Sequence, residues 1–153
     1  MRLIVQSVIS FLILNPILTQ IDYQVEKPVI VFAQDQSESI LIPVQDTNVF
    51  LASYKNKIDS LLERLEENYE VRKFSFGEKL SDNLDFQFNQ KQTDISSVFE
   101  EITNRFENRN LGALIMASDG LYNKGTNPVY SSNLLKVPVF SIALGDTTVR
   151  KDI

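Results

Sequence analysis

A short apolar run that ends in a group of oxygen-bearing side chains constrains this chain more than any other feature. Val29 to Ala33 is continuously apolar and rich in β-branched residues, a pattern typical of a strand buried on both faces of a parallel sheet. Asp35, Ser37 and Ser39 follow it in the order Asp-x-Ser-x-Ser. A buried strand with three oxygen ligands at its carboxyl end predicts an α/β fold with a polar site at one edge of the sheet.

The composition excludes several kinds of site. The 153 residues include neither His nor Cys, so a Ser-His-Asp triad, a zinc site built on imidazole or thiolate, and a Cys nucleophile are impossible. Any metal must be held by oxygen, which favours Mg²⁺, with Mn²⁺ or Ca²⁺ as alternatives. The net charge of -5 argues against a nucleic-acid binder. Neither a Walker loop nor Gly-x-Gly-x-x-Gly is present, so no small-molecule substrate is evident.

The N-terminal segment is apolar. Residues 3–21 carry no charge, which predicts a transmembrane helix over residues 1–21 and a linker over residues 22–28. Arg2 precedes this run and acidic residues follow it, so we expect a cytoplasmic N-terminus and an extracytoplasmic domain, periplasmic in a Gram-negative cell. A signal peptide and a buried helix of a soluble domain remain alternatives.

Helical and extended patterns alternate along the rest of the chain. Further strands are predicted at residues 69–76, 111–117 and 137–144, the first of them near a sheet edge. Helices are predicted within the segments 46–68, 93–110 and 129–135. Alternation of Leu84, Phe86 and Phe88 predicts a short strand in an otherwise polar loop. This order predicts a Rossmann-like, doubly wound, mainly parallel sheet with helices on both faces, over residues 29–153.

Two more oxygen ligands stand at the ends of predicted elements. Thr93 opens a helix, and Asp119 follows the strand at residues 111–117. Ligands of open α/β sheets bind outside the carboxyl ends of the strands, where the strand order reverses. If the first strand and the 111–117 strand flank that point, one crevice receives Asp35, Ser37, Ser39, Thr93 and Asp119 as metal ligands.

The chemistry of these five side chains favours binding over catalysis. Their two carboxylates and three hydroxyls can surround a hard cation, and neutral hydroxyls leave the ion able to accept a carboxylate from a partner. We expect no enzyme activity, since no general base lies in evident reach. A phosphatase with an Asp nucleophile would need a second Asp where Ser37 stands. The alternative is that these residues only cap helices and form turns.

Together these residues resemble the metal-ion-dependent adhesion site (MIDAS) of von Willebrand factor A (vWA) domains: Asp35-x-Ser37-x-Ser39, then Thr93, then Ser118-Asp119-Gly120. The apolar run before them resembles the membrane-anchored vWA proteins of bacteria. The resemblance implies a Rossmann-like fold that binds Mg²⁺ directly through the three hydroxyls, with the two carboxylates often acting through water. It also implies that an acidic residue of a partner protein occupies the open metal position.

The expected function is therefore a membrane-anchored, metal-dependent protein-interaction module. The alternative is a structural vWA module of a larger membrane assembly, with a degenerate or purely structural metal site. Glu38 departs from the family pattern, because many members carry a small residue there, and it adds negative charge beside the metal. The family's sheet commonly has six strands and a closing helix, so we expect the chain to be a fragment of a longer protein.

Overall fold

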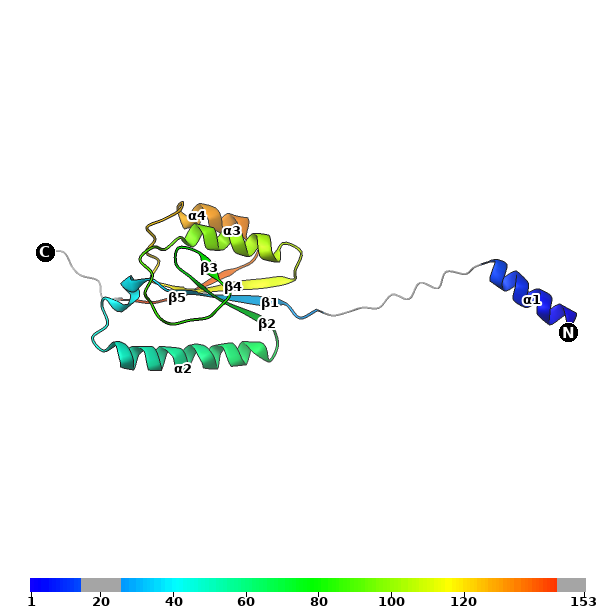
Figure 1. The fold of residues 1–153 in the computed structure, drawn as a ribbon, viewed down its shortest axis with the longest axis horizontal. Helices are drawn as coiled ribbons and strands as arrows, with labels where there is room; N and C mark the ends of the chain where they lie inside the picture. Colours follow the sequence, from blue (N-terminus) through cyan, green and yellow to red (C-terminus); the bar gives the residue numbers. More distant parts are fainter. Residues whose placement is uncertain (15–25, 146–153) are drawn as a thin grey trace.

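The computed structural model describes residues 1–14 and 26–145, and its centre is a five-stranded sheet in the order β3-β2-β1-β4-β5 (Figure 1). The strands are β1 (Val29–Asp35), β2 (Glu70–Phe76), β3 (Leu80–Ser81), β4 (Leu111–Ser118) and β5 (Val139–Ala143). β1 pairs in parallel with β2 and β4, and β4 pairs in parallel with β5. Only β3 is antiparallel to its neighbour β2. The predicted mainly parallel α/β sheet is confirmed, and β2 lies one strand in from the edge.

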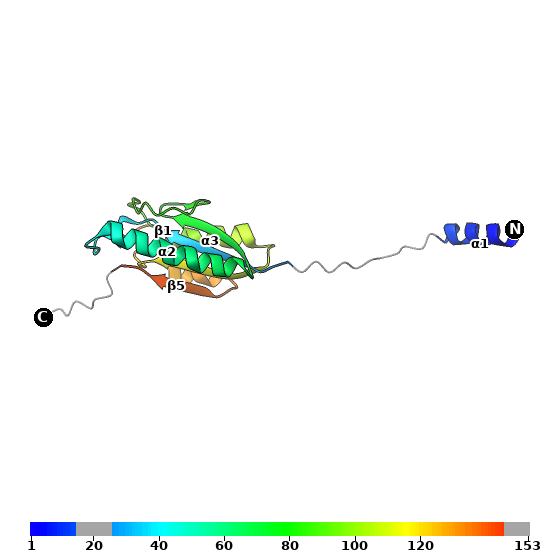
Figure 2. The same ribbon diagram turned by 90° about the horizontal axis from the view of Figure 1, so that it is seen from below.

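Helices cover both faces of this sheet, as predicted. Figures 1 and 2 show α2 (Thr47–Glu66) on one face, and α3 (Ile95–Phe106) with the short α4 (Pro128–Ser131) on the other. Two 3₁₀ turns, η1 (Glu38–Leu41) and η2 (Ser132–Leu134), follow β1 and α4. The 129–135 helix of the sequence prediction is thus divided between α4 and η2.

β1 joins two hydrophobic cores, one on each face of the sheet. All seven of its residues are buried. Val31 and Ala33 belong to the core beneath α3, and Phe32 belongs to the core beneath α2. Successive side chains of a strand point to opposite faces, so the part of β1 that contacts both cores, Val29 to Ala33, must be apolar throughout.

Two aspartates fix where the long helices begin. Asp46 caps α2 by accepting a hydrogen bond from the Val49 amide (3.1 Å), and Asp94 caps α3 by accepting one from the Ser97 amide (3.0 Å). Each carboxylate satisfies a backbone donor that the first helical turn leaves without a partner. Because Asp94 is the cap, Thr93 is held immediately before α3.

The predicted short strand at Leu84, Phe86 and Phe88 is wrong. The short strand lies earlier, at β3, and residues 84–88 form a loop whose apolar side chains pack beneath α2. Phe88 is buried, and both Phe86 and Phe88 make edge-to-face contacts with Tyr54. The alternation therefore reflects insertion of loop side chains into the core rather than pairing with a neighbouring strand.

The N-terminal segment contains α1 (Arg2–Ile13), which has no buried residue. No helix within residues 1–14 and 26–145 combines the length and the apolar character that a membrane crossing requires. Residues 15–21 of the predicted transmembrane segment and residues 22–25 of the predicted linker lie outside the described residues, as do residues 146–153 of the predicted domain.

Replacing Tyr54 with Phe tests how α2 holds the end of β1. The Tyr54 hydroxyl donates to Oε1 of Gln34, which is fully buried, and Nε2 of Gln34 donates to the Asp35 carbonyl (2.9 Å). Tyr54→Phe leaves a buried acceptor without a partner, so the free energy of unfolding should fall by about 1–3 kcal/mol in urea denaturation. Tyr130→Phe, at an exposed position, is the control. Equal losses in both variants would contradict this role.

Candidate metal centre

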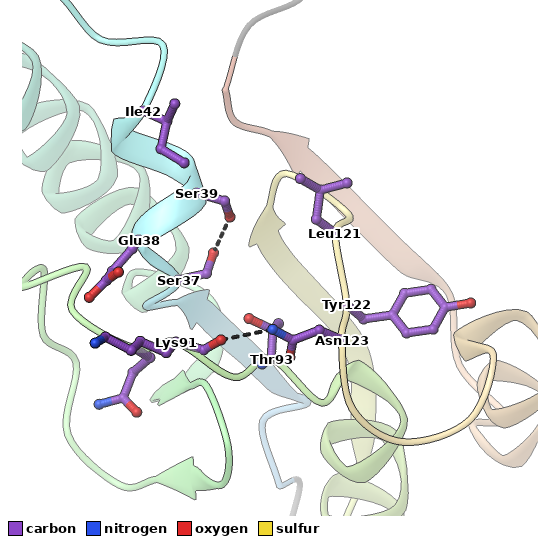
Figure 3. Close-up of a pocket in the computed structure, with 10 residues that line it drawn as sticks. Ser37, Glu38, Ser39, Ile42, Lys91, Thr93, Leu121, Tyr122 and Asn123 are labelled. Atoms are coloured by element: carbon purple, nitrogen blue, oxygen red, sulfur yellow. Dashed lines mark hydrogen bonds between the residues drawn. The ribbon is translucent and has the colours of Figure 1, made fainter.

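The predicted ligand residues meet at one edge of the sheet. β1 lies between β2 and β4. The first crossover leads from β1 to β2 on one side, and the later crossover leads to β4 on the other side, so the strand order reverses at β1. The loops after β1 and β4 leave the sheet side by side at this point. A cavity of about 320 Å³ opens between them, and Ser37, Ser39 and Thr93 line it (Figure 3).

Asp35 connects the end of β1 to the end of β4. Its Oδ1 accepts a hydrogen bond from the Ser37 amide (2.8 Å), and its Oδ2 accepts one from the Ser118 hydroxyl (2.6 Å). The Asp35 side chain is fully buried. Asp35 therefore fixes the turn that carries Ser37 and orients it towards β4.

Asp119 makes the second connection between the two loops. Its Oδ2 accepts a hydrogen bond from the Ser39 hydroxyl (2.5 Å), while its Oδ1 accepts one from the Leu121 amide (2.9 Å). The Ser39 hydroxyl oxygen also lies 3.0 Å from that of Ser37. Four of the five predicted residues thus form one hydrogen-bonded group with Ser118.

Thr93 reaches the cavity from a third segment, and Asn123 holds it there. The Thr93 amide donates to Oδ1 of Asn123 (2.9 Å), and Nδ2 of Asn123 donates to the Lys91 carbonyl (2.8 Å). The Asn123 amide in turn donates to the Thr93 carbonyl (3.2 Å). Thr93 lines the cavity although the residue as a whole is only 3% exposed.

The donor set fits a small hard cation. Neighbouring oxygens around an octahedral Mg²⁺ lie about 2.9 Å apart, given Mg–O distances of about 2.1 Å. The Ser37 and Ser39 hydroxyl oxygens have this spacing, at 3.0 Å. A serine hydroxyl can offer a lone pair to a cation while it donates its proton in a hydrogen bond to a carboxylate, as Ser39 does to Asp119. Within residues 1–14 and 26–145 no three His, Cys, Asp or Glu side chains cluster, so hydroxyls must supply much of any coordination.

Burial makes the ionised form of Asp35 costly. Removal from water raises the pKa of Asp35 above its ordinary value, and the nearby Asp119 charge acts in the same direction. Hydrogen bonds from Ser118 and Ser37 lower the pKa but offset only part of this rise. A cation in the cavity would favour the ionised carboxylate and would offset part of the cost of its burial.

Two residues around the site, Ser118 and Asn123, have roles that were not predicted. Ser118 lies within the Ser-Asp-Gly motif, but its bond to Asp35 depends on the pairing of β1 with β4. Asn123 holds Thr93, and no local pattern links the two residues, which are 30 positions apart. Glu38 is exposed and its side chain lines the cavity, so its negative charge does lie beside the site (Figure 3).

Comparison with known proteins supports the fold but does not show a family. No protein-family model matches the sequence, and no curated protein matches it either. Two structures of proximal thread matrix protein 1 (PTMP1) from the mussel byssus are similar, with TM-scores of 0.58 and 0.56 at 17% and 19% identity. Each alignment covers 77% of this chain, but only 38% and 36% of the PTMP1 chains. The likeness supports a vWA-like α/β fold.

The raised pKa of Asp35 predicts a stabilising substitution. Asn in place of Asp35 keeps an oxygen for the Ser37 amide and can donate to Ser118, but it carries no charge. A carboxyl whose pKa is raised by folding costs no stability below its unfolded pKa, near 3.8, and lowers stability as the pH rises towards its folded pKa. In EDTA, Asp35→Asn should therefore unfold at a higher urea concentration than the wild type at pH 7, with the difference gone near pH 3. Lower stability than the wild type at pH 7 would contradict this account.

Proposed function

We propose that this chain is a vWA-like protein-interaction module that binds a divalent cation, Mg²⁺ first, and uses it to hold an acidic side chain of a partner protein. Ser37, Ser39 and Thr93 would contribute hydroxyl oxygens, and Asp35 and Asp119 would balance the charge of the cation. When bound, the cation would supply an open, electrophilic position for a carboxylate. Glu38 beside the cavity would favour the cation and oppose a second negative charge on the partner.

One observation carries this proposal: three hydroxyls line one cavity at the switch point of the sheet, and two carboxylates next to it accept hydrogen bonds from the loop that carries two of these hydroxyls. The loop after β1, the residue before α3 and the loop after β4 each contribute. Helix caps and turns do not need such convergence, because each cap bonds within its own segment. The caps of α2 and α3 are Asp46 and Asp94. Although Asp35 and Asp119 each accept one bond within their own turn, each also accepts a second bond from a distant segment.

We infer that the module does not catalyse a reaction. The chain has no His or Cys to act as base or nucleophile. Both carboxylates at the site already accept two hydrogen bonds each, from Ser37 and Ser118 in one case and from Ser39 and Leu121 in the other. A carboxylate that is held in this way orients neighbouring groups, and its oxygens are occupied by donors of the protein rather than by a substrate.

A second candidate function is a structural module of a larger membrane assembly, in which the cation only ties loops together. The observation in its favour is that hydrogen bonds from Ser118 to Asp35 and from Ser39 to Asp119 already join the two loops. A partner pull-down with and without EDTA separates the candidates. Partner recovery should depend on Mg²⁺ if the cation bridges to the partner, and should persist in EDTA if the cation is structural or absent.

We also propose that the uncharged run of residues 3–21 anchors the chain in a membrane, with the domain on the extracytoplasmic side. The support is the sequence itself, together with α1, whose apolar side chains are all exposed over residues 2–13. An exposed apolar helix of this kind is favoured in a lipid environment over water.

Mg²⁺ should raise the melting temperature of the full chain. A ligand at about ten times its dissociation constant stabilises the folded state by about 1.4 kcal/mol, which corresponds to a shift of a few degrees for a domain of this size. Scanning calorimetry in MgCl₂ and in EDTA measures the shift. Ser37→Ala and Asp35→Asn should remove most of it, whereas Ser60→Ala, on the exposed side of α2, should keep it.

For each variant, the melting temperature in MgCl₂ is compared with the melting temperature of the same variant in EDTA, because each substitution also changes stability without metal. No shift in the wild type with Mg²⁺, Mn²⁺ or Ca²⁺ would refute metal binding. An equal shift in Ser37→Ala and the wild type would place the metal elsewhere.

Membrane anchoring has its own test. After expression in bacteria, the full chain should remain with the membrane pellet through carbonate extraction, and an added protease outside the inner membrane should cleave the domain. Replacing Leu12 with Lys puts a charge inside the apolar run and should release the chain into the soluble fraction. Recovery of the intact wild-type chain in the soluble fraction would show the anchoring proposal to be wrong.

A further inference from the structure

Two exposed apolar side chains stand at the mouth of the candidate metal centre. Ile42 is 81% exposed and Leu121 is 63% exposed, and both line the cavity that contains Ser37, Ser39 and Thr93 (Figure 3). Single exposed apolar residues are common on protein surfaces, but two that converge on one cavity from separate loops are typical of an interaction site.

Each of these apolar residues is fixed to one of the ligand residues. The Ile42 amide donates to the Ser39 carbonyl (3.2 Å), at the end of the 3₁₀ turn η1. The Leu121 amide donates to Oδ1 of Asp119 (2.9 Å). The backbone that carries each apolar side chain is therefore held in place relative to the oxygens that would surround a cation, which lowers the entropic cost of binding a partner there.

The other side of the cavity has a different character. Glu38, Gln90 and Lys91 also line the cavity, and Figure 3 shows the exposed Glu38 and Lys91 across it from Leu121. A segment that crossed the cavity would meet oxygen ligands in the middle, polar side chains on one side and apolar side chains on the other. This asymmetry gives the site a means to select what stands next to an acidic residue.

We propose that the partner presents an extended segment in which a large apolar residue stands within one or two positions of the metal-bound acidic residue. The acidic side chain completes the coordination of the cation, and the apolar side chain packs between Ile42 and Leu121. This inference rests on the proposed metal-dependent function and adds the class of partner. A partner of this class needs both an acidic and an apolar side chain, and the two side chains must stand a fixed distance apart.

The test starts with a displayed library of peptides that have one fixed Asp and random flanking positions. The full chain, kept in a non-ionic detergent that solvates α1, is the bait in MgCl₂ and, separately, in EDTA. Peptides recovered only in MgCl₂ should be enriched in Leu, Ile, Val or Phe beside the Asp. A synthetic peptide of the enriched sequence should bind about tenfold more weakly to Ile42→Ser and to Leu121→Ser than to the wild type.

The matched control is Leu134→Ser, which removes an exposed leucine at η2, outside this cavity, and should bind the peptide as the wild type does. Ile42→Ser and Leu121→Ser should also keep the Mg²⁺-induced shift in melting temperature, which shows that the cation site is intact. Enrichment without apolar preference, no enrichment at all, or unchanged binding by both variants would each overturn the inference while that shift persists. Absence of the shift in the wild type would instead refute the proposed function, and this inference with it.

Discussion

The parallel pairing of β1 with β4 is the constraint on which the rest of the site depends. Their register places Gln34 beside Ala117. The residues that follow these two, Asp35 and Ser118, therefore come together where the strands end. The resulting 2.6 Å hydrogen bond joins segments 83 positions apart. β1 can occupy this place only because it is apolar on both faces and contacts two cores. The same pattern that forms the core therefore also sets the position of the ligands.

Burial and charge act against each other at this edge of the sheet. Asp35 is buried, and its raised pKa records the free-energy cost of an ionised carboxylate in that position. Asp119 and Glu38 add negative charge nearby, and the two loops hold the hydroxyls of Ser37 and Ser39 together. A cation bound at this edge of the sheet would offset these charges, because it would supply positive charge beside the carboxylates.

The sequence was sufficient to predict the strands and helices whose periodicity is set by the core, and hence the sheet. It was also sufficient to bring Asp35, Ser37, Ser39 and Asp119 together, because each stands at the end of a buried strand. It failed where a contact is long-range and local pattern carries no signal, as with Asn123 holding Thr93. The same limit explains the wrong strand at residues 84–88, since alternation describes side chains that enter a core as well as paired strands.

The most direct test of the central claim is a crystal structure of the chain grown with MnCl₂, with anomalous differences recorded at a wavelength where manganese scatters strongly. The account predicts one strong peak within about 2.2 Å of the Ser37 and Ser39 hydroxyl oxygens, with Thr93 facing it. A cavity without such a peak at saturating Mn²⁺, or a manganese ion bound only at other residues, would contradict the claim that these loops form a metal centre.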